Sequence, residues 1–527
     1  MILRRYAALL TLVLYSLPAT AVEVQDPNDA LICHDQPVKL DLLRYVRAAS
    51  LDLRGHMPRP DELESIELTD DADTVPEALL DSWLASDAFI AQAVRRHRTY
   101  FWNNLSQVDM FQPQKEIRAT GNIFWSPRKS RMLRSGSNVQ VRCFDEPAQF
   151  DAAGRPVTRL DENGYRREGW VEVNPYWAPN TTVRVCAFDA QTTQVSSAGR
   201  DCRTGAGNND EECGCGPNLN WCATSGIERR IKRSMATSLE QLIAAAVGTE
   251  GNYLDLFESR RGFADGALVH YYRHLRYSTR FQSTPSPITD EALPDVPYPD
   301  TNWHEFELGR DHAGALTHPA YLLRFQTNRA RASRFYEEFL CAPFVPPSGG
   351  LPAASDESAR DPDLQVRAGC KYCHAQLEPA ASHWGRWTEQ GVGYLNTSRF
   401  PALNHDCLDC ALSGRCNAFC RNNYVTRALS EKEEPYLGML QSYAFRRSDH
   451  MHYVEQGPKL IARKAVAENT LPRCVARQTA EWLMGRAATS DDDHWILDLS
   501  QKFVRSGFDY RGLVKAVILS PQYRRVQ

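Results

Sequence analysis

The stretch Ala368-Gly369-Cys370-Lys371-Tyr372-Cys373-His374 carries the most specific chemistry in this chain. It contains the pattern Cys-x-x-Cys-His, which is the attachment motif of c-type haem. The two thiols of such a motif add to the two vinyl groups of haem, and the histidine that follows supplies an imidazole nitrogen to the iron. We therefore predict that Cys370 and Cys373 anchor one covalent haem c and that His374 is an axial iron ligand.

Three other uses of the motif remain open at this stage. A Cys-x-x-Cys pair can form a short-range disulfide, supply half of a zinc site, or act as a thioredoxin-like redox centre. A zinc site needs two more ligands at a matching spacing, and a thioredoxin-like centre needs a βαβ context. The motif instead follows a loop rich in Pro, Ser and Asp, from Pro346 to Asp363. This context favours the haem interpretation.

The first 21 residues have the composition of a secretory signal peptide. A basic start precedes an apolar stretch, Ala7 to Leu17, which is too short to span a bilayer, and Ala19-Thr20-Ala21 is a small-x-small cleavage site. No later stretch of the sequence is long and apolar enough to predict a transmembrane segment. We therefore expect a protein exported to the periplasm or beyond, which is also where bacteria attach haem c.

Charge and cysteine content narrow the class of protein further. The formal net charge of −4 provides no field that would attract nucleic acid. The chain has 15 Cys, and in an oxidising compartment most of them should pair. With two assigned to haem the remainder is odd, so at least one thiol should be unpaired or intermolecular. Cys341 and Cys474 each stand alone in a helical pattern, and we predict that one of them is a buried free thiol.

Residues 107–229 differ in character from the rest of the chain. Alternating side chains in Trp170–Asn174 and Thr182–Val185 predict short strands. Six cysteines in this segment predict a disulfide-rich β insert, although spacing alone does not give the connectivity. They are Cys143, Cys186, Cys202, Cys213, Cys215 and Cys222.

A second dense cluster follows the haem motif and consists of Cys407, Cys410, Cys416 and Cys420. Its first two members have the spacing of haem anchors, but Ala411 stands where the ligand histidine would be, so a second haem is not expected. Four cysteines so close together could bind zinc. In an exported protein, two local disulfides are the favoured alternative.

Outside the insert, apolar residues recur at helical spacing, and the predicted fold is mainly α. In the C-terminal part, helices are predicted at Tyr436–Phe445, Arg473–Met484, Trp495–Phe503 and Tyr510–Ile518. A cytochrome c-like haem segment is expected in the C-terminal half. The expected organisation is a signal peptide (1–21), an N-terminal helical domain (22–106), the Cys-rich β insert (107–229), a helical domain (230–345), the haem c segment with its Cys-rich loop (346–429) and a C-terminal helical domain (430–527).

Two further residues are candidates for contact with haem. Arg386 lies between Trp384 and Trp387, and it could pair with a haem propionate while the indole rings cover the macrocycle. A packed turn is the alternative. The distal iron ligand is predicted to be Met451, with His452 as the alternate, because Asp449–His452 is expected in a break between helices, before a Gly-Pro turn. The alternative is that these side chains pack on the helical body.

Short motifs at both ends and in the middle of the chain resemble those of planctomycete-type cytochrome c proteins. Leu51–Glu62 resembles their LDL-x-G-x-P-P-x-x-x-E signature, and Leu316–Tyr321 resembles the LTHPA element before the haem motif. Three stretches near the C-terminus, Glu481–Arg486, Phe503–Tyr510 and Ser520–Arg524, are similar to their ending. Glu378-Pro379 stands where the family usually has Asp-Pro, and the Cys-rich insert is not expected in every member. The resemblance implies an exported bacterial protein with covalent haem, and it implies no substrate.

These observations leave three functional hypotheses. A single haem motif favours a monohaem electron-transfer protein with an unknown redox partner protein. The chain is far longer than one haem requires, so a haem-dependent oxidoreductase is the second hypothesis, although no phosphate loop, nucleophile elbow or dinucleotide fingerprint is present in the sequence. The third is an extracytoplasmic binding or structural protein.

Overall fold

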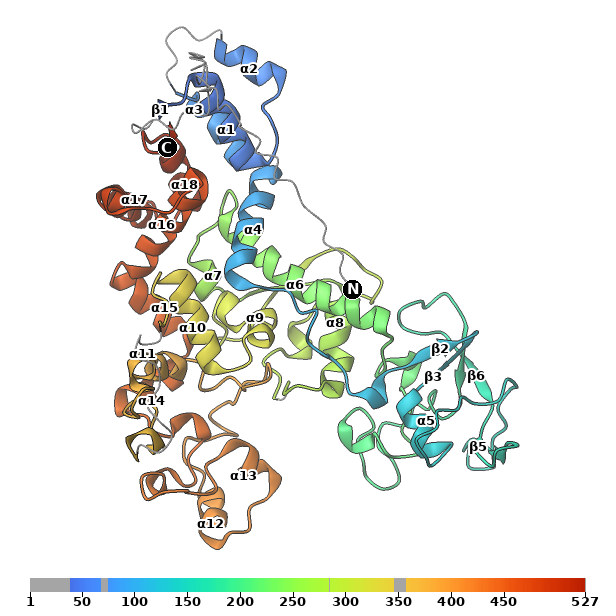
Figure 1. The fold of residues 1–527 in the computed structure, drawn as a ribbon. Coiled ribbons are helices and arrows are strands. Elements are labelled where there is room, and N and C mark those ends of the chain that lie inside the picture. Colours follow the sequence, from blue (N-terminus) through green and yellow to red (C-terminus); the bar gives the residue numbers. More distant parts are fainter. Residues whose placement is uncertain (1–37, 68–73, 284, 346–356, 527) are drawn as a thin grey trace, which may run out of the picture.

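The computed structural model describes residues 38–67, 74–283, 285–345 and 357–526. Within these ranges the chain is mostly helical, and disulfides are present in the β region and outside it (Figure 1). The predicted mainly α fold with a disulfide-rich β insert is confirmed to that extent. The predicted signal peptide and residues 346–356 of the loop before the haem motif lie outside the described residues.

The first and last described elements pack together at one end of the molecule, where Figure 1 shows blue and red elements side by side. Strand β1 (Val38–Lys39) pairs antiparallel with β10 (Arg525–Val526). The hydroxyl of Tyr45 donates a hydrogen bond to the carbonyl of Ile518 at 2.7 Å, and that of Tyr523 donates to Asp52 at 2.6 Å. The N-terminal and C-terminal helices therefore share one core with the centre of the chain.

The N-terminal helices are α1 (Leu42–Arg54), α2 (Pro60–Glu67), α3 (Glu77–Leu84) and α4 (Asp87–Phe101). The C-terminal helices are α14 (Ser448–Gln456), α15 (Pro458–Ala467), α16 (Thr470–Met484), α17 (Asp493–Arg505) and α18 (Tyr510–Ile518). Local sequence sets several of these ends. Helix α1 begins after Asp41, whose carboxylate accepts from the amide of Arg44, and it ends at Gly55, whose φ of 75° favours glycine.

The central part of the chain is built on the long helix α6 (Ser225–Val247). It is capped by Thr224 and buries Ile227, Ile231, Met235 and Leu239, which recur every four residues on one face. The other central elements are α7 (Asp255–Glu258), β8 (Arg261–Ala264), α8 (Gly266–His270), β9 (His304–Glu307), α9 (Pro319–Arg324) and α10 (Asn328–Phe339).

The insert contains a four-stranded sheet in the order β2-β3-β7-β6, in which the β3–β7 pair is parallel and the others are antiparallel. All six cysteines of this segment are paired, as predicted, in the disulfides Cys143–Cys186, Cys202–Cys213 and Cys215–Cys222. The elements of the insert are β2 (Arg118–Thr120), β3 (Ile123–Trp125), α5 (Pro127–Leu133), β4 (Arg159–Leu160), β5 (Arg166–Arg167), β6 (Trp170–Val173) and β7 (Val183–Cys186).

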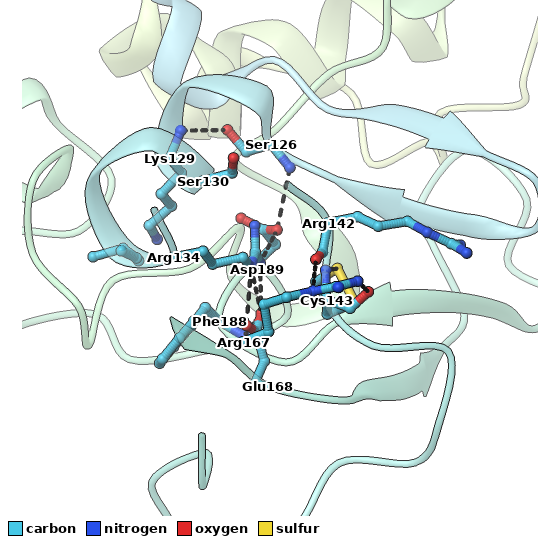
Figure 2. Close-up of polar contacts among 12 residues, drawn as sticks. Ser126, Lys129, Ser130, Arg134, Arg142, Cys143, Arg167, Glu168, Phe188 and Asp189 are labelled. Atoms are coloured by element: carbon cyan, nitrogen blue, oxygen red, sulfur yellow. Dashed lines mark hydrogen bonds and ion pairs between the residues drawn. A yellow bond between two sulfur atoms is a disulfide. The ribbon is translucent and has the colours of Figure 1, made fainter. Parts of the chain in front are cut away.

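A buried ionic network lies beside the Cys143–Cys186 disulfide of the insert (Figure 2). The guanidinium of Arg134 donates to Glu168 Oε1 at 2.5 Å and to Asp189 Oδ2 at 2.8 Å, and the amide of Ser126 also donates to Asp189. All three charged side chains are almost wholly buried. Removing one partner of such a group typically costs about 3–5 kcal/mol, because the remaining charge stays buried. The insert therefore depends on this network as well as on its disulfides.

The remaining disulfides correct one prediction and confirm another. Cys341 and Cys474 are bonded to each other, so neither is the free thiol that we predicted, because the fold brings the end of α10 against α16. Cys407–Cys420 and Cys410–Cys416 are the two local disulfides that were favoured over zinc. Among the described cysteines only Cys370 and Cys373 are unpaired, and Cys33 lies outside the described residues.

Two helix boundaries in the C-terminal part differ from the prediction. The segment Tyr436–Phe445 is not an α-helix: it contains the end of one 3₁₀ turn (Glu434–Tyr436) and a second one (Gln441–Tyr443), separated by Gly438, whose φ of 76° lies outside the helical region. The predicted break at Asp449–His452 is instead the first part of α14. In the part of the chain that the structure describes, no helix has the length and hydropathy required to cross a membrane.

We predict that the Cys341–Cys474 disulfide contributes more to stability than any local disulfide of the Cys-rich loop. It closes a separation of 133 residues, against 6 for Cys410–Cys416. Loop-closure entropy then gives about 5 kcal/mol for the first and about 2 kcal/mol for the second. Denaturant unfolding of Cys341→Ala/Cys474→Ala, with Cys410→Ala/Cys416→Ala as the matched control, measures the difference. Equal midpoints for the two double variants would contradict this prediction.

Candidate haem c site

The haem motif lies on the first turn of helix α11 (Lys371–Ser382). Gly369 has a φ of 77°, which permits the turn into the helix, and the amides of Cys373 and His374 both donate to the carbonyl of Cys370. One helical turn therefore separates the two thiols, and the histidine follows directly. Both thiols are partly exposed, so a group that bonds to them can reach them from solvent.

The structure gives no support to the alternative uses of the motif. The two cysteines are not bonded to each other. Within the described ranges, the only cluster of potential metal ligands lies in the insert, so no further His, Cys, Asp or Glu completes a zinc site here. A 3₁₀ turn (Glu357–Arg360) and irregular backbone lead into α11, where a thioredoxin-like centre would have a strand.

The surroundings of the motif fit a large apolar group. Tyr372 within the motif is 64% exposed, Val366 just before it is 57% exposed, and Val345, whose carbonyl lies 3.7 Å from Cys373 Sγ, is 71% exposed. These three side chains are exposed close to the motif in sequence or through the contact with Cys373, and a group bound there would cover apolar surface. The macrocycle of a haem attached to these two thiols is a suitable group.

The imidazole of His374 is oriented by a carboxylate on its own helix. Its Nδ1 atom lies 2.7 Å from Oε1 of Glu378, four residues later, so the two side chains share one face of α11. A carboxylate acceptor places the proton on Nδ1 and leaves the lone pair of Nε2 free for a metal. This is the tautomer that an iron ligand requires.

Glu378 is itself held by two arginines from other parts of the chain. Arg329 on α10 donates through Nε to Oε1 at 2.5 Å, and Arg446, just before α14, donates to Oε2 at 3.0 Å. Burial alone would raise the pKa of Glu378, but the hydrogen bond from Arg329 and the charge of Arg446 outweigh burial and hold this pKa below its usual value. The carboxylate beside His374 is therefore ionised at neutral pH.

A small polar cavity adjoins this carboxylate clamp, by which we mean Glu378 with Arg329 and Arg446. It has a volume of about 270 Å³, and both arginines line it. Its other polar lining side chains include Asn328, Thr388, Asn422, Asn423, Gln441 and Ser442. Glu378 thus links His374 to the two arginines that line this cavity.

Arg386 does not contact the haem motif. It is 2% exposed, and its guanidinium donates to the carbonyls of Leu395 and Phe400, to the hydroxyl of Tyr443 and to Glu455. The flanking tryptophans are buried as well, and the indole of Trp384 donates to a backbone carbonyl. These contacts are those of the packed-turn alternative, and none of them supports a role for Arg386 at a haem propionate.

Met451 lies on α14 and is partly buried. It packs against the apolar cluster that contains Phe400, Cys420, Tyr424 and Val454, so its contacts are those of the packing alternative. Helix α14 nevertheless packs against α11, which carries the motif.

The histidines near Met451 differ in their surroundings. His450 is buried against Arg447, whereas His452 is exposed. His383 is stacked on Tyr453, with ring centroids 4.7 Å apart. The distal iron ligand therefore stays a prediction.

Sequence reasoning did not identify the carboxylate clamp. The spacing of four residues between His374 and Glu378 was a usable signal, because such residues are neighbours on a helix. No comparable signal exists for the arginines, which lie 49 and 68 residues from Glu378 along the chain.

Comparisons with known proteins add nothing to this geometry: no family model, no curated protein and no solved structure matches the chain.

We predict that Arg386 stabilises the fold and does not contribute to haem binding. Arg386→Met leaves two carbonyls and a hydroxyl without their donor, and each buried group left unpaired costs about 1–3 kcal/mol. Thermal unfolding should therefore show a clear loss of stability, while the visible spectrum and haem content of the folded protein stay unchanged. The exposed Arg399, replaced in the same way, is the control. A changed haem spectrum without loss of stability would show that the packed-turn interpretation is wrong.

Proposed function

We propose that this protein is an exported monohaem c-type cytochrome that transfers electrons. The observation that carries the proposal is the state of the cysteines: twelve of those described are in disulfides, and the two that are unpaired belong to the Cys-x-x-Cys-His motif. In a chain so rich in disulfides, a pair left as thiols is available for another covalent use, and the histidine that follows favours addition to haem vinyl groups.

Several features support electron transfer as the role of this haem. The motif lies at the surface of the molecule and its thiols are partly exposed, so one edge of the macrocycle would be accessible to a redox partner protein. A partner that only exchanges electrons needs no substrate pocket over the iron. The disulfides are consistent with an oxidising compartment outside the cytosol, where haem c is attached.

Replacement of the two anchors tests this proposal. The wild-type protein, produced in a host with cytochrome c maturation, should retain haem after denaturation, as seen on a haem-stained gel. Cys370→Ala/Cys373→Ala should lose all of it, because both thioether bonds are gone. The Cys410→Ala/Cys416→Ala variant removes a nearby pair that has no following histidine, and it should keep its haem. A wild-type protein without covalent haem would falsify the proposal.

A haem-dependent oxidoreductase is the second candidate, and one observation favours it. The polar cavity beside the carboxylate clamp is large enough for a small polar molecule, and its lining offers amide, hydroxyl and guanidinium groups. Haem proteins that transfer electrons and haem enzymes differ in the sixth ligand of the iron. A stable Met or His ligand favours electron transfer, whereas an open or water-filled position favours catalysis.

We predict that Met451 supplies this sixth ligand, with His452 as the alternate. Met451→Ala should lower the reduction potential, because a Met/His ligand pair raises the potential of cytochromes c, and it should remove the weak far-red absorption band of Met-ligated ferric haem. His452→Ala is the matched comparison on the same helix. If the spectra of both variants equal that of the wild type, the iron is open or has another ligand, and the oxidoreductase becomes the better proposal.

A further inference from the structure

We infer that Glu378 is the positioning residue for the proximal histidine and that the carboxylate clamp sets the reduction potential of the iron. This inference rests on the proposed function, because it assigns a role to residues behind the histidine of the haem motif. It concerns the chain's own groups: one carboxylate and the two guanidinium groups that hold it.

The hydrogen bond between His374 and Glu378 fixes the orientation of the imidazole. Glu378 Oε1 accepts from His374 Nδ1 at 2.7 Å, which restricts rotation of the imidazole about its bond to Cβ. Glu378 cannot follow a rotating ring, because Arg329 and Arg446 bind both of its oxygens from two other elements. The direction of the remaining nitrogen, Nε2, is thus determined by contacts among three segments of the chain.

The charge of Glu378 also acts on the ligand. A histidine that donates to a carboxylate is a more basic ligand, and a more basic ligand stabilises ferric over ferrous iron. Glu378 is 4% exposed, so water screens its charge poorly. The two arginines weaken this effect on the iron, because their positive charges lie beside the same carboxylate and partly neutralise it. The clamp therefore allows the potential to be shifted in either direction by a single substitution.

Loss of the negative charge and loss of a positive charge should shift the reduction potential in opposite directions, which provides a sharp test. Glu378→Gln keeps the size of the side chain and removes the negative charge, so the potential should rise. Arg329→Gln removes a positive charge and leaves the carboxylate a stronger acceptor, so the potential should fall. Arg329 is about half exposed, with 47% of its side chain accessible, so this variant is expected to fold even if Glu378→Gln does not. A merely structural role would change stability in both variants without opposite shifts of potential.

The matched control is Glu389→Gln. Glu389 also lines the polar cavity and is exposed, and it accepts from the amide of Asn328 on the helix that carries Arg329. It makes no contact with His374 among those described, so its loss removes one negative charge from the same region without touching the ligand. Glu378→Asp, which keeps the charge, is a second control for orientation alone.

The experiment is a potentiometric titration of the full chain carrying covalent haem, with haem content measured in parallel. We expect the one-electron equilibrium to shift at least tenfold toward ferrous iron in Glu378→Gln, about 59 mV, and in the opposite direction in Arg329→Gln. Glu389→Gln should shift it less than either, and Glu378→Asp should lie between the wild type and Glu378→Gln.

The outcomes distinguish a failure of this inference from a failure of the proposed function. Haem retained in Glu378→Gln and Arg329→Gln, with potentials no further from the wild type than Glu389→Gln, overturns this inference and leaves the proposed function intact. Covalent haem missing from the wild type itself overturns the proposed function, and this inference with it. If only Arg329→Gln folds, a fall in its potential beyond that of the control supports the inference, and an unchanged potential overturns it.

Discussion

A buried carboxylate stays ionised only with partners, and Glu378 has partners from three separate parts of the chain. Its own helix supplies His374, α10 supplies Arg329, and the segment before α14 supplies Arg446. Arg446 and the carboxylate are both largely buried, and each would be costly to bury alone. Together the carboxylate and the two arginines join the motif helix to the central core and to the C-terminal helices. This small group of charges therefore fixes the position of the motif helix together with its packing on α10 and α14.

Local chemistry was predictable from the sequence, and long-range contacts were not. The motif, the β insert and the paired cysteines at 407–420 could be recognised because residue type and short spacing carry the information. The Cys341–Cys474 bond could not, because two lone cysteines separated by 133 residues give no local signal. Arg386 illustrates the same limit, since a Trp-Gly-Arg-Trp turn can face a cofactor or the core. Only its tertiary partners show that it faces the core.

The insert and the helical body obtain their stability in different ways. The body shares one large apolar core from Tyr45 to Tyr523, in which amphipathic helices bury their apolar faces. The insert has short strands and small apolar clusters, so little apolar surface can be buried there. Three disulfides and the buried Arg134–Glu168–Asp189 network take the place of a large core.

The bond between Cys341 and Cys474 encloses the whole Cys-x-x-Cys-His motif in a covalent ring, because Cys370, Cys373 and His374 lie between its two ends. A protease that cuts the chain once anywhere inside this ring produces two polypeptides that are still joined. In an environment rich in proteases, a protein with this bond can be nicked once beside the motif without losing the piece that carries the motif, and a haem attached there as proposed would stay with it. After a single cut, release of that piece requires a second cut inside the ring or a reductant, and reductants are scarce where disulfides form.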